Sequence, residues 1–168
     1  MAQVYISVGS NIDREHHVLA GLLALRKCFG PLVISTAYQN KAVGFKGDDF
    51  LNLVVGLATQ ADVRTVAASL REIEVTHGRR WDAPKFSPRT LDLDLLLYDE
   101  LVLEAEGLQL PRDEITRYAF VLCPLAEVAG KRRHPILGAT FEELWEAFDK
   151  RHAQLLPITL PLSFSESP

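Results

Sequence analysis

The order in which strand-like and helix-like patterns follow one another limits the fold more than any other feature of this sequence. Alternating apolar residues predict four strands, over Val4–Val8, Val33–Gln39, Phe50–Leu57 and Thr90–Tyr98. Apolar residues at helical spacing predict a helix after the first strand and another after the third. The order strand–helix–strand–strand–helix–strand is typical of an α+β, ferredoxin-like fold, in which helices cover one face of an antiparallel sheet. We expect the functional site on the other face.

Shorter patterns predict additional elements after the fourth strand. Leu101–Leu103 and Leu108–Leu110 indicate a small hairpin, and Ile115–Cys123 indicates a short helix that ends before Pro124. Thr140 and Glu143 have the spacing of a capping box, which predicts a last helix that runs to residue 148.

Two irregular segments and the length of the chain define the expected domain. Residues 79–89 are too polar and too rich in proline for a regular element. The tail, 155–168, is expected either to form an extended strand or to be disordered. With 168 residues and no linker, the chain is expected to form a single domain over residues 1–168.

Composition narrows the class of protein. The chain is 48% hydrophobic and 24% charged, which is ordinary for a soluble globular protein, and its net charge of -4 argues against a nucleic-acid partner. No apolar run reaches the length of a membrane span, and the N-terminus lacks the pattern of a signal peptide. Two isolated cysteines indicate a reducing compartment, so we expect a cytoplasmic protein. A monomer is expected, with a dimer as the alternative.

Two carboxylates on the fourth strand carry the strongest chemical signal. In Thr90–Leu95 the leucines share one face, and Asp92 and Asp94 share the other. Their Cα atoms are expected to lie roughly 6.6–6.8 Å apart, so their oxygens can converge on one cation or bridge two. Mg²⁺ prefers such oxygen ligands together with substrate phosphates. The nearby cations Arg79, Lys85 and Arg89 are the groups that a polyphosphate needs.

Simpler interpretations stay open. An Asp-x-Asp pair can be a solvated strand face, and a basic loop can be a solvated connector. His16 and His17 are adjacent, so they do not share a helix face, and a zinc site there is not expected. No Ser/His/Asp or Cys/His constellation can be nominated from the sequence alone.

Several strings resemble one enzyme family, the 6-hydroxymethyl-7,8-dihydropterin pyrophosphokinases of folate biosynthesis. The resemblance is carried by YISVGSN at 5–11, FLN at 50–52, SPRTLDLDLLLYDE at 87–100 and AFVLCPLAE at 119–127. It implies a ferredoxin-like fold, ATP as co-substrate, two Mg²⁺ ions, and transfer of pyrophosphate to the pterin hydroxymethyl group with release of AMP.

The resemblance also implies roles for particular residues. Asp92 and Asp94 match metal ligands with a catalytic role, and Arg79, Lys85 and Arg89 match catalytic residues that also bind ATP. Further ATP-binding positions are Glu74 and Arg112. The pterin would be bound by Val43, Phe50, Asn52 and Phe120, with two aromatic faces around the ring and an amide at its edge.

The chain departs from the family pattern at several positions. Asn40-Lys41 replaces a Thr-Pro pair, Lys85-Phe86 replaces an arginine and a tryptophan, Arg112 replaces a histidine, and Tyr118 stands where an arginine is usual. We expect Asn40 and Lys41 at the rim of the pterin pocket. The departures leave open a paralogous branch, an enzyme for a related pterin, and a non-catalytic module that binds pterin or nucleotide.

Overall fold

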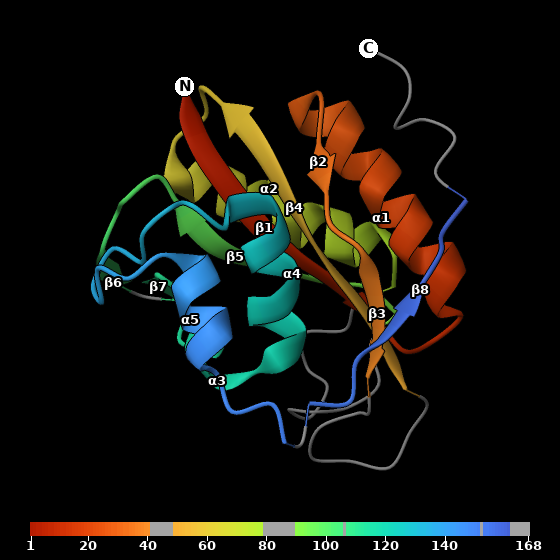
Figure 1. Cartoon of the computed structure of the whole chain (residues 1–168). Helices are drawn as coiled ribbons and strands as arrows, with labels where there is room; N and C mark the ends of the chain where they lie inside the picture. Colours follow the sequence, from red (N-terminus) through yellow and green to blue (C-terminus); the bar gives the residue numbers. More distant parts are fainter. Residues whose placement is uncertain (41–48, 79–89, 106, 152, 162–168) are drawn as a thin grey trace.

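The computed structural model describes residues 1–40, 49–78, 90–105, 107–151 and 153–161. Its elements, in chain order, are β1 Ala2–Ser10, α1 Arg14–Phe29, β2 Val33–Ile34, β3 Ala37–Asn40, β4 Phe50–Thr59, α2 Val63–Thr76, β5 Asp92–Tyr98, β6 Leu103–Ala105, β7 Leu108–Leu110, α3 Glu114–Arg117, α4 Ala119–Ala129, α5 Phe141–Ala147 and β8 Leu156–Ile158 (Figure 1).

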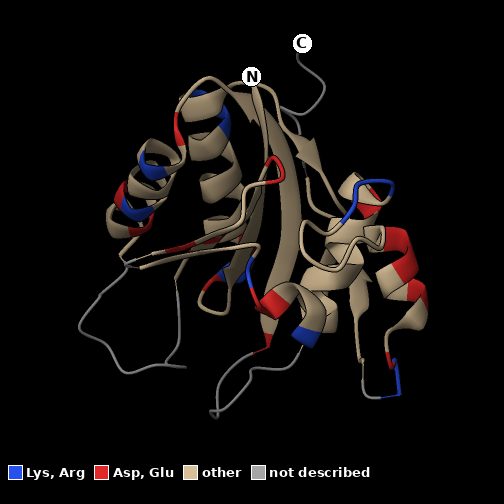
Figure 2. Cartoon of the chain, turned by 90° about the vertical axis from the view of Figure 1, so that its left-hand side faces the viewer, with Lys and Arg blue, Asp and Glu red and all other residues tan. Residues whose placement is uncertain are grey.

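One antiparallel sheet organises the chain. Its strands follow the order β5-β1-β4-β3-β8, with β2 also paired to β4, and β6 pairs separately with β7. Helices α1 and α2 cover one face, and α3, α4 and α5 lie on the other, so the sheet is seen edge-on between two helical layers in Figure 2. The α+β class and the antiparallel sheet are confirmed. The second face, however, is partly covered by helices.

Each face of the sheet has its own apolar core. Beneath α1 and α2 lie side chains such as Ile6, Leu53 and Leu93, all nearly or fully buried. Beneath α4 and α5 lie Tyr5, Val54 and Leu96. Alternation along each strand produces this division, because neighbouring side chains point to opposite faces.

Several expected elements are confirmed. Asp62 caps α2 by accepting a hydrogen bond from the backbone N of Thr65 at 2.8 Å. Thr140 and Glu143 form the capping box that begins α5. The extended alternative for the tail is confirmed over β8, which pairs with β3, whereas residues 162–168 lie outside the described residues.

The first strand of the expected hairpin lies at Leu103–Ala105 instead of Leu101–Leu103. Two other expected elements are each divided in two. The strand predicted over 33–39 is divided into β2 and β3, because the side chain of Ser35 bonds to the backbone N of Val54 at 2.9 Å in place of regular pairing. The short helix predicted to end before Pro124 is instead two helices, and Pro124 lies buried inside α4. Proline removes one hydrogen bond from the helix, but apolar packing on both sides of it sustains α4.

Within the described ranges no helix has both the length and the apolar composition needed to span a bilayer.

Candidate functional site

A row of polar positions crosses the sheet on the face toward α4. The row consists of four residues that pair in register on adjacent strands: Asp92 of β5, Gly9 of β1, Asn52 of β4 and Tyr38 of β3. Neighbouring strands lie ~4.8 Å apart, so the row brings a carboxylate, an amide and a phenol onto one surface although they are far apart in sequence.

The predicted carboxylate pair lies on this surface. Asp92 and Asp94 are both half-buried, whereas Leu91, Leu93 and Leu95 are buried in the core under α1 and α2. The predicted division of faces along this strand is therefore confirmed. Two partly exposed carboxylates on adjacent outward positions fit the oxygen chemistry of Mg²⁺, which takes its remaining ligands from water and phosphate. Among the described residues, no cluster of three or more His, Cys, Asp or Glu side chains offers a site made of protein ligands alone.

Glu74 supports β5 from α2. Its carboxylate is only 2% exposed, and Oε2 accepts a hydrogen bond from the backbone N of Leu93 at 2.8 Å. Leu93 lies between the two aspartates, and β5 is the outermost strand of the sheet on this side. Glu74 thus accepts a backbone hydrogen bond at the edge of the sheet, where no further strand pairs with β5 among the described residues. It thereby holds the backbone that carries Asp92 and Asp94.

Arg112 places a cation beside the carboxylates. Its Nη2 lies 3.6 Å from Oδ1 of Asp94 and 2.6 Å from Oε2 of Glu114. Its backbone N also donates to the carbonyl of Leu96 at 3.1 Å, which ties this segment to β5. Partial burial opposes the charge of the guanidinium, but the carboxylates of Asp94, Glu114 and Asp92 outweigh it and raise the pKa of Arg112. The side chain therefore stays a cation at every physiological pH.

The side-chain amide of Asn52 is buried and closely packed. The side chain is 6% exposed, and its Nδ2 donates to Oδ1 of Asn40 at 2.6 Å. A Cβ at Gly9 would lie 2.4 Å from Oδ1 of Asn52, so only glycine leaves room for this amide. Asn40 ends β3, is 8% exposed and turns its side chain toward Asn52. Its place at the rim of a pterin pocket stays a prediction. Lys41 lies outside the described residues.

Two predicted aromatic residues stand where elements begin near this surface. Phe50 is the first residue of β4, and Phe120 lies in the first turn of α4; both are half-buried. The starts of β4 and α4 lie at the same end of the sheet, the lower end in Figure 1. The ring of Tyr118, which stands where the resembled family usually has an arginine, stacks on Phe120 at a centroid distance of 5.0 Å.

The predicted residues Val43, Arg79, Lys85 and Arg89 lie outside the described residues. A network that the sequence did not reveal joins the residues on either side of 41–48. Arg14 donates to the side chain of Gln39 at 2.6 Å and to the carbonyl of Asp49 at 3.2 Å, and Gln39 donates to the Asp49 carboxylate at 3.1 Å. No sequence signal pairs these three residues, because the packing of α1 against the sheet brings them together.

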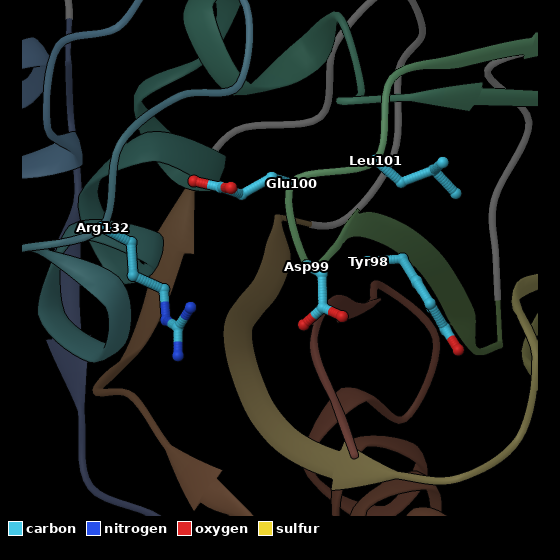
Figure 3. A pocket seen from close by; sticks show the side chains of 5 residues that line it. All are labelled: Tyr98, Asp99, Glu100, Leu101 and Arg132. Atoms are coloured by element: carbon cyan, nitrogen blue, oxygen red, sulfur yellow. The ribbon is translucent and has the colours of Figure 1, made fainter.

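Two cavities lie at different parts of the sheet. One of about 410 Å³ is bounded by Gln39, Asn40 and Asp49 on one side and by residues 153–156 on the other, so the tail contributes a wall beside the amide pair. A second, of about 610 Å³, lies at the far end of β5, where Asp99 and Glu100 face Arg132 (Figure 3). None of the described residues that line the second cavity is a predicted site residue.

Comparison with known proteins points to one family. The family described as "7,8-dihydro-6-hydroxymethylpterin-pyrophosphokinase (HPPK)" matches residues 5–130. The 2-amino-4-hydroxy-6-hydroxymethyldihydropteridine pyrophosphokinase of Aquifex aeolicus is 32% identical over 145 residues, covering 85% of this chain and 90% of that protein. The protein of the same name from Bacillus subtilis is 34% identical over 128 residues, covering 74% of this chain and 76% of that one.

Solved structures agree on the fold. A Plasmodium falciparum HPPK-DHPS structure superposes with a TM-score of 0.66 at 13% identity, covering 87% of this chain. This chain spans only 43% of that longer chain. At this identity the likeness shows a shared fold and says nothing of individual residues.

Proposed function

The chain belongs to the 7,8-dihydro-6-hydroxymethylpterin-pyrophosphokinase family, and from this premise we propose that it transfers pyrophosphate from ATP to the hydroxymethyl group of 6-hydroxymethyl-7,8-dihydropterin. AMP is released, and the product serves folate biosynthesis. The observation that carries the proposal is the polar row, which places a carboxylate pair and a buried amide on one surface of the sheet. We also propose a single-domain, cytoplasmic monomer whose partners are its two small-molecule substrates.

Asp92 and Asp94 are proposed to hold two Mg²⁺ ions together with the phosphates of ATP. The fit rests on their half-buried oxygens, on the shared face of β5, and on the support of that strand by Glu74. When bound, Mg²⁺ neutralises phosphate charge where negative charge develops. The two aspartates keep the metal sites at a fixed place relative to Asn52, because all three side chains stand on hydrogen-bonded strands.

Pterin recognition is proposed to involve Asn52, with Phe50, Phe120 and Val43 as further contacts. A flat pterin ring presents a polar edge, and a buried amide can pair with it through one donor and one acceptor. Asn40 binds the donor side of the Asn52 amide, so it sets which edge of that amide faces a ligand. Aromatic rings above and below a pterin exclude water and fix its plane.

Nucleotide binding is proposed to involve Arg112, Glu74, Arg79, Lys85 and Arg89. Arg112 is already held beside Asp94, so it can contact a phosphate without a large rearrangement. Glu74 acts through the backbone of β5, which makes it a support of the phosphate site. The other three cations complete the charge that a triphosphate requires.

One assay tests the proposed reaction. Purified protein is incubated with ATP, Mg²⁺ and 6-hydroxymethyl-7,8-dihydropterin, and the nucleotide product is identified. AMP is expected, since the transferred group is pyrophosphate; ADP would mean a single phosphoryl transfer, and no nucleotide product would favour the non-catalytic alternative. Chelation by EDTA should stop the reaction, and added Mg²⁺ should restore it.

The same assay addresses a related pterin as substrate. The buried Asn40–Asn52 pair is the observation that favours testing this alternative, because Asn40 stands at a departure from the family pattern. A series of dihydropterins that differ only at position 6 is compared by turnover and by competition binding. Equal use of a bulkier substituent would identify a broader or different substrate.

A further inference from the structure

Glu127 joins α4 to the start of β3 through both of its carboxylate oxygens. Oε2 accepts a hydrogen bond from the hydroxyl of Tyr38 at 2.5 Å, and Oε1 accepts one from the backbone N of Thr36 at 3.0 Å. We call these two hydrogen bonds the Glu127 bridge. They connect a helix to β3 across 91 and 89 positions of sequence. None of the roles proposed above uses this glutamate.

On the helix, the bridge lies on the same stripe as the proposed pterin contact. Phe120, Cys123 and Glu127 follow the spacing of one helical face. Phe120 precedes Glu127 by two turns, about 10 Å along the axis. Pro124 lies between them and removes one hydrogen bond of the helix. The side chain of Cys123, one turn from Phe120, also contacts Tyr38, so a shift at the Tyr38 end is transmitted toward Phe120. α4 packs on β4 and β3. The stripe lies beside the buried face of the helix, on the side toward β3, because Glu127 reaches Tyr38 and Thr36.

On the sheet, the bridge ends beside the amide. Tyr38 stands opposite Asn52 in the register of β3 and β4. Burial and the hydrogen bond to Glu127 raise the pKa of Tyr38, so its hydroxyl stays protonated and donates to the carboxylate. A phenol that donates to a carboxylate forms a charge-assisted hydrogen bond, which is shorter and stronger than a neutral one.

We propose that Glu127 is a positioning residue, which through Tyr38 and Thr36 sets the place of the first turn of α4, and of Phe120, relative to the Asn52 amide. This inference rests on the proposed function, because Phe120 and Asn52 are assigned there to the pterin. Glu127 itself lies on the surface and two helical turns from Phe120, so it acts on pterin affinity and touches neither substrate. Loss of the bridge therefore affects the pterin site and spares the metal and nucleotide sites on β5.

The test compares three variants of the full chain. Glu127→Ala removes both hydrogen bonds, Tyr38→Phe removes one from the opposite partner, and the pair is combined in a double variant. The dissociation constant of the dihydropterin is measured by its fluorescence in the presence of a non-transferable ATP analogue, and the KM for ATP and kcat are measured separately. Glu127→Ala is expected to weaken pterin binding about tenfold, as charged hydrogen bonds do. The KM for ATP and kcat should change by less than about twofold.

Two further comparisons separate positioning from a loss of stability. Glu143→Ala is the matched control, because Glu143 also bonds to a backbone N, on α5, but does not reach β3; it should leave pterin binding unchanged. Glu127→Gln keeps an acceptor oxygen and should restore part of the affinity. In the double variant the two losses should not add, because each single change already breaks the same hydrogen bond.

Hydrogen exchange in the ligand-free protein distinguishes failure of this inference from failure of the proposed function. Glu127→Ala should speed exchange in the first turn of α4 and leave β5 unchanged. If wild-type protein binds no pterin but this exchange pattern appears, the bridge is confirmed as an anchor and the pterin function is wrong. If wild-type protein binds pterin and both Glu127→Ala and Tyr38→Phe bind it as tightly, the inference is overturned. Equal losses for pterin and ATP would also overturn it.

Discussion

The two ends of the sheet face beneath α4 differ although the same strands form both. At one end, Leu96 and Val54 are almost fully buried against α4 and α5. At the other end, the same strands carry Asp92 and Asn52, which contact other polar groups. Within β5 the change takes place over four residues, from a carboxylate at 92 to a leucine at 96. One part of the strand thus contributes to stability and the adjacent part to the proposed chemistry, so we expect substitutions to affect one without the other.

A bulge marks the boundary between these ends. Along β1 and β5, Ile6 pairs with Leu95 and the next position, Tyr5, pairs with Leu97, so Leu96 is an extra residue. Because of it, Leu96 and Leu97 both contribute to the core beneath α4. Bulges are frequent beside functional sites, where they re-aim side chains. Here the bulge allows an apolar cover to begin directly after the carboxylate pair.

The largest effect should come from the polar end. Asp94→Asn keeps the size of a half-buried side chain but removes its charge, so the fold should persist while turnover falls about 10³-fold, or ~4 kcal/mol in the barrier. The measurement is AMP release at saturating substrates, together with thermal unfolding. Asp99→Asn, at the other end of the strand, is the control; its side chain accepts a hydrogen bond from Gln3 that asparagine can also accept. Near wild-type activity of Asp94→Asn would refute the metal assignment.

The apolar end should respond in stability alone. Leu96 is 1% exposed, so Leu96→Ala should lower the free energy of unfolding by about 2–5 kcal/mol through lost burial and a new cavity. Turnover per folded molecule, measured well below the transition, should change little. Leu23→Ala removes an exposed leucine of α1 and serves as control. If Leu96→Ala lowered turnover as strongly as Asp94→Asn does, the two ends would not be separable.

The division of faces along β5 could be predicted from the sequence up to the bulge and not beyond it. The alternation from Leu91 to Leu95 assigns Asp92 and Asp94 correctly to the face opposite the leucines. Past that point the same alternation would place Leu97 with the leucines of the α1 side, whereas Leu97 contacts the α4 side. A bulge depends on pairing with β1, which no pattern within β5 records.

The residues that surround the predicted site could not be predicted from the sequence, because contacts between segments far apart in the chain bring them together. The sequence indicated Asn52 but not its hydrogen bond to Asn40, because nothing local shows that β3 turns the Asn40 amide toward β4. The covering of the second sheet face was also missed. A proline at 124 is a helix-ending signal in isolation, and only burial on the sheet allows α4 to continue through it.

An intermediate effect is expected at the amide. Asn52→Ala should weaken pterin binding roughly 5- to 150-fold, since an unpaired buried polar group costs about 1–3 kcal/mol. Gly9→Ala should weaken it as well, because the added methyl group would displace Oδ1 of Asn52. Both are measured by equilibrium binding of the dihydropterin, with Gln109→Ala on the exposed side of β7 as control. Unchanged binding in both variants would remove Asn52 from the pterin site.

The smallest effect is expected where α5 begins. Thr140 accepts a hydrogen bond from the backbone N of Glu143 at 3.1 Å, and α5 packs against α4 above the apolar end. Thr140→Ala should therefore cost about 1 kcal/mol of unfolding free energy, the usual value of a lost helix cap. Thr140→Ser keeps the hydroxyl and should recover most of it, as measured by urea unfolding. Pterin and ATP affinities should be unchanged, because α5 packs against α4, which the Glu127 bridge holds to β3. A loss of pterin affinity in Thr140→Ala that Thr140→Ser reverses would show that the apolar cover also controls the site.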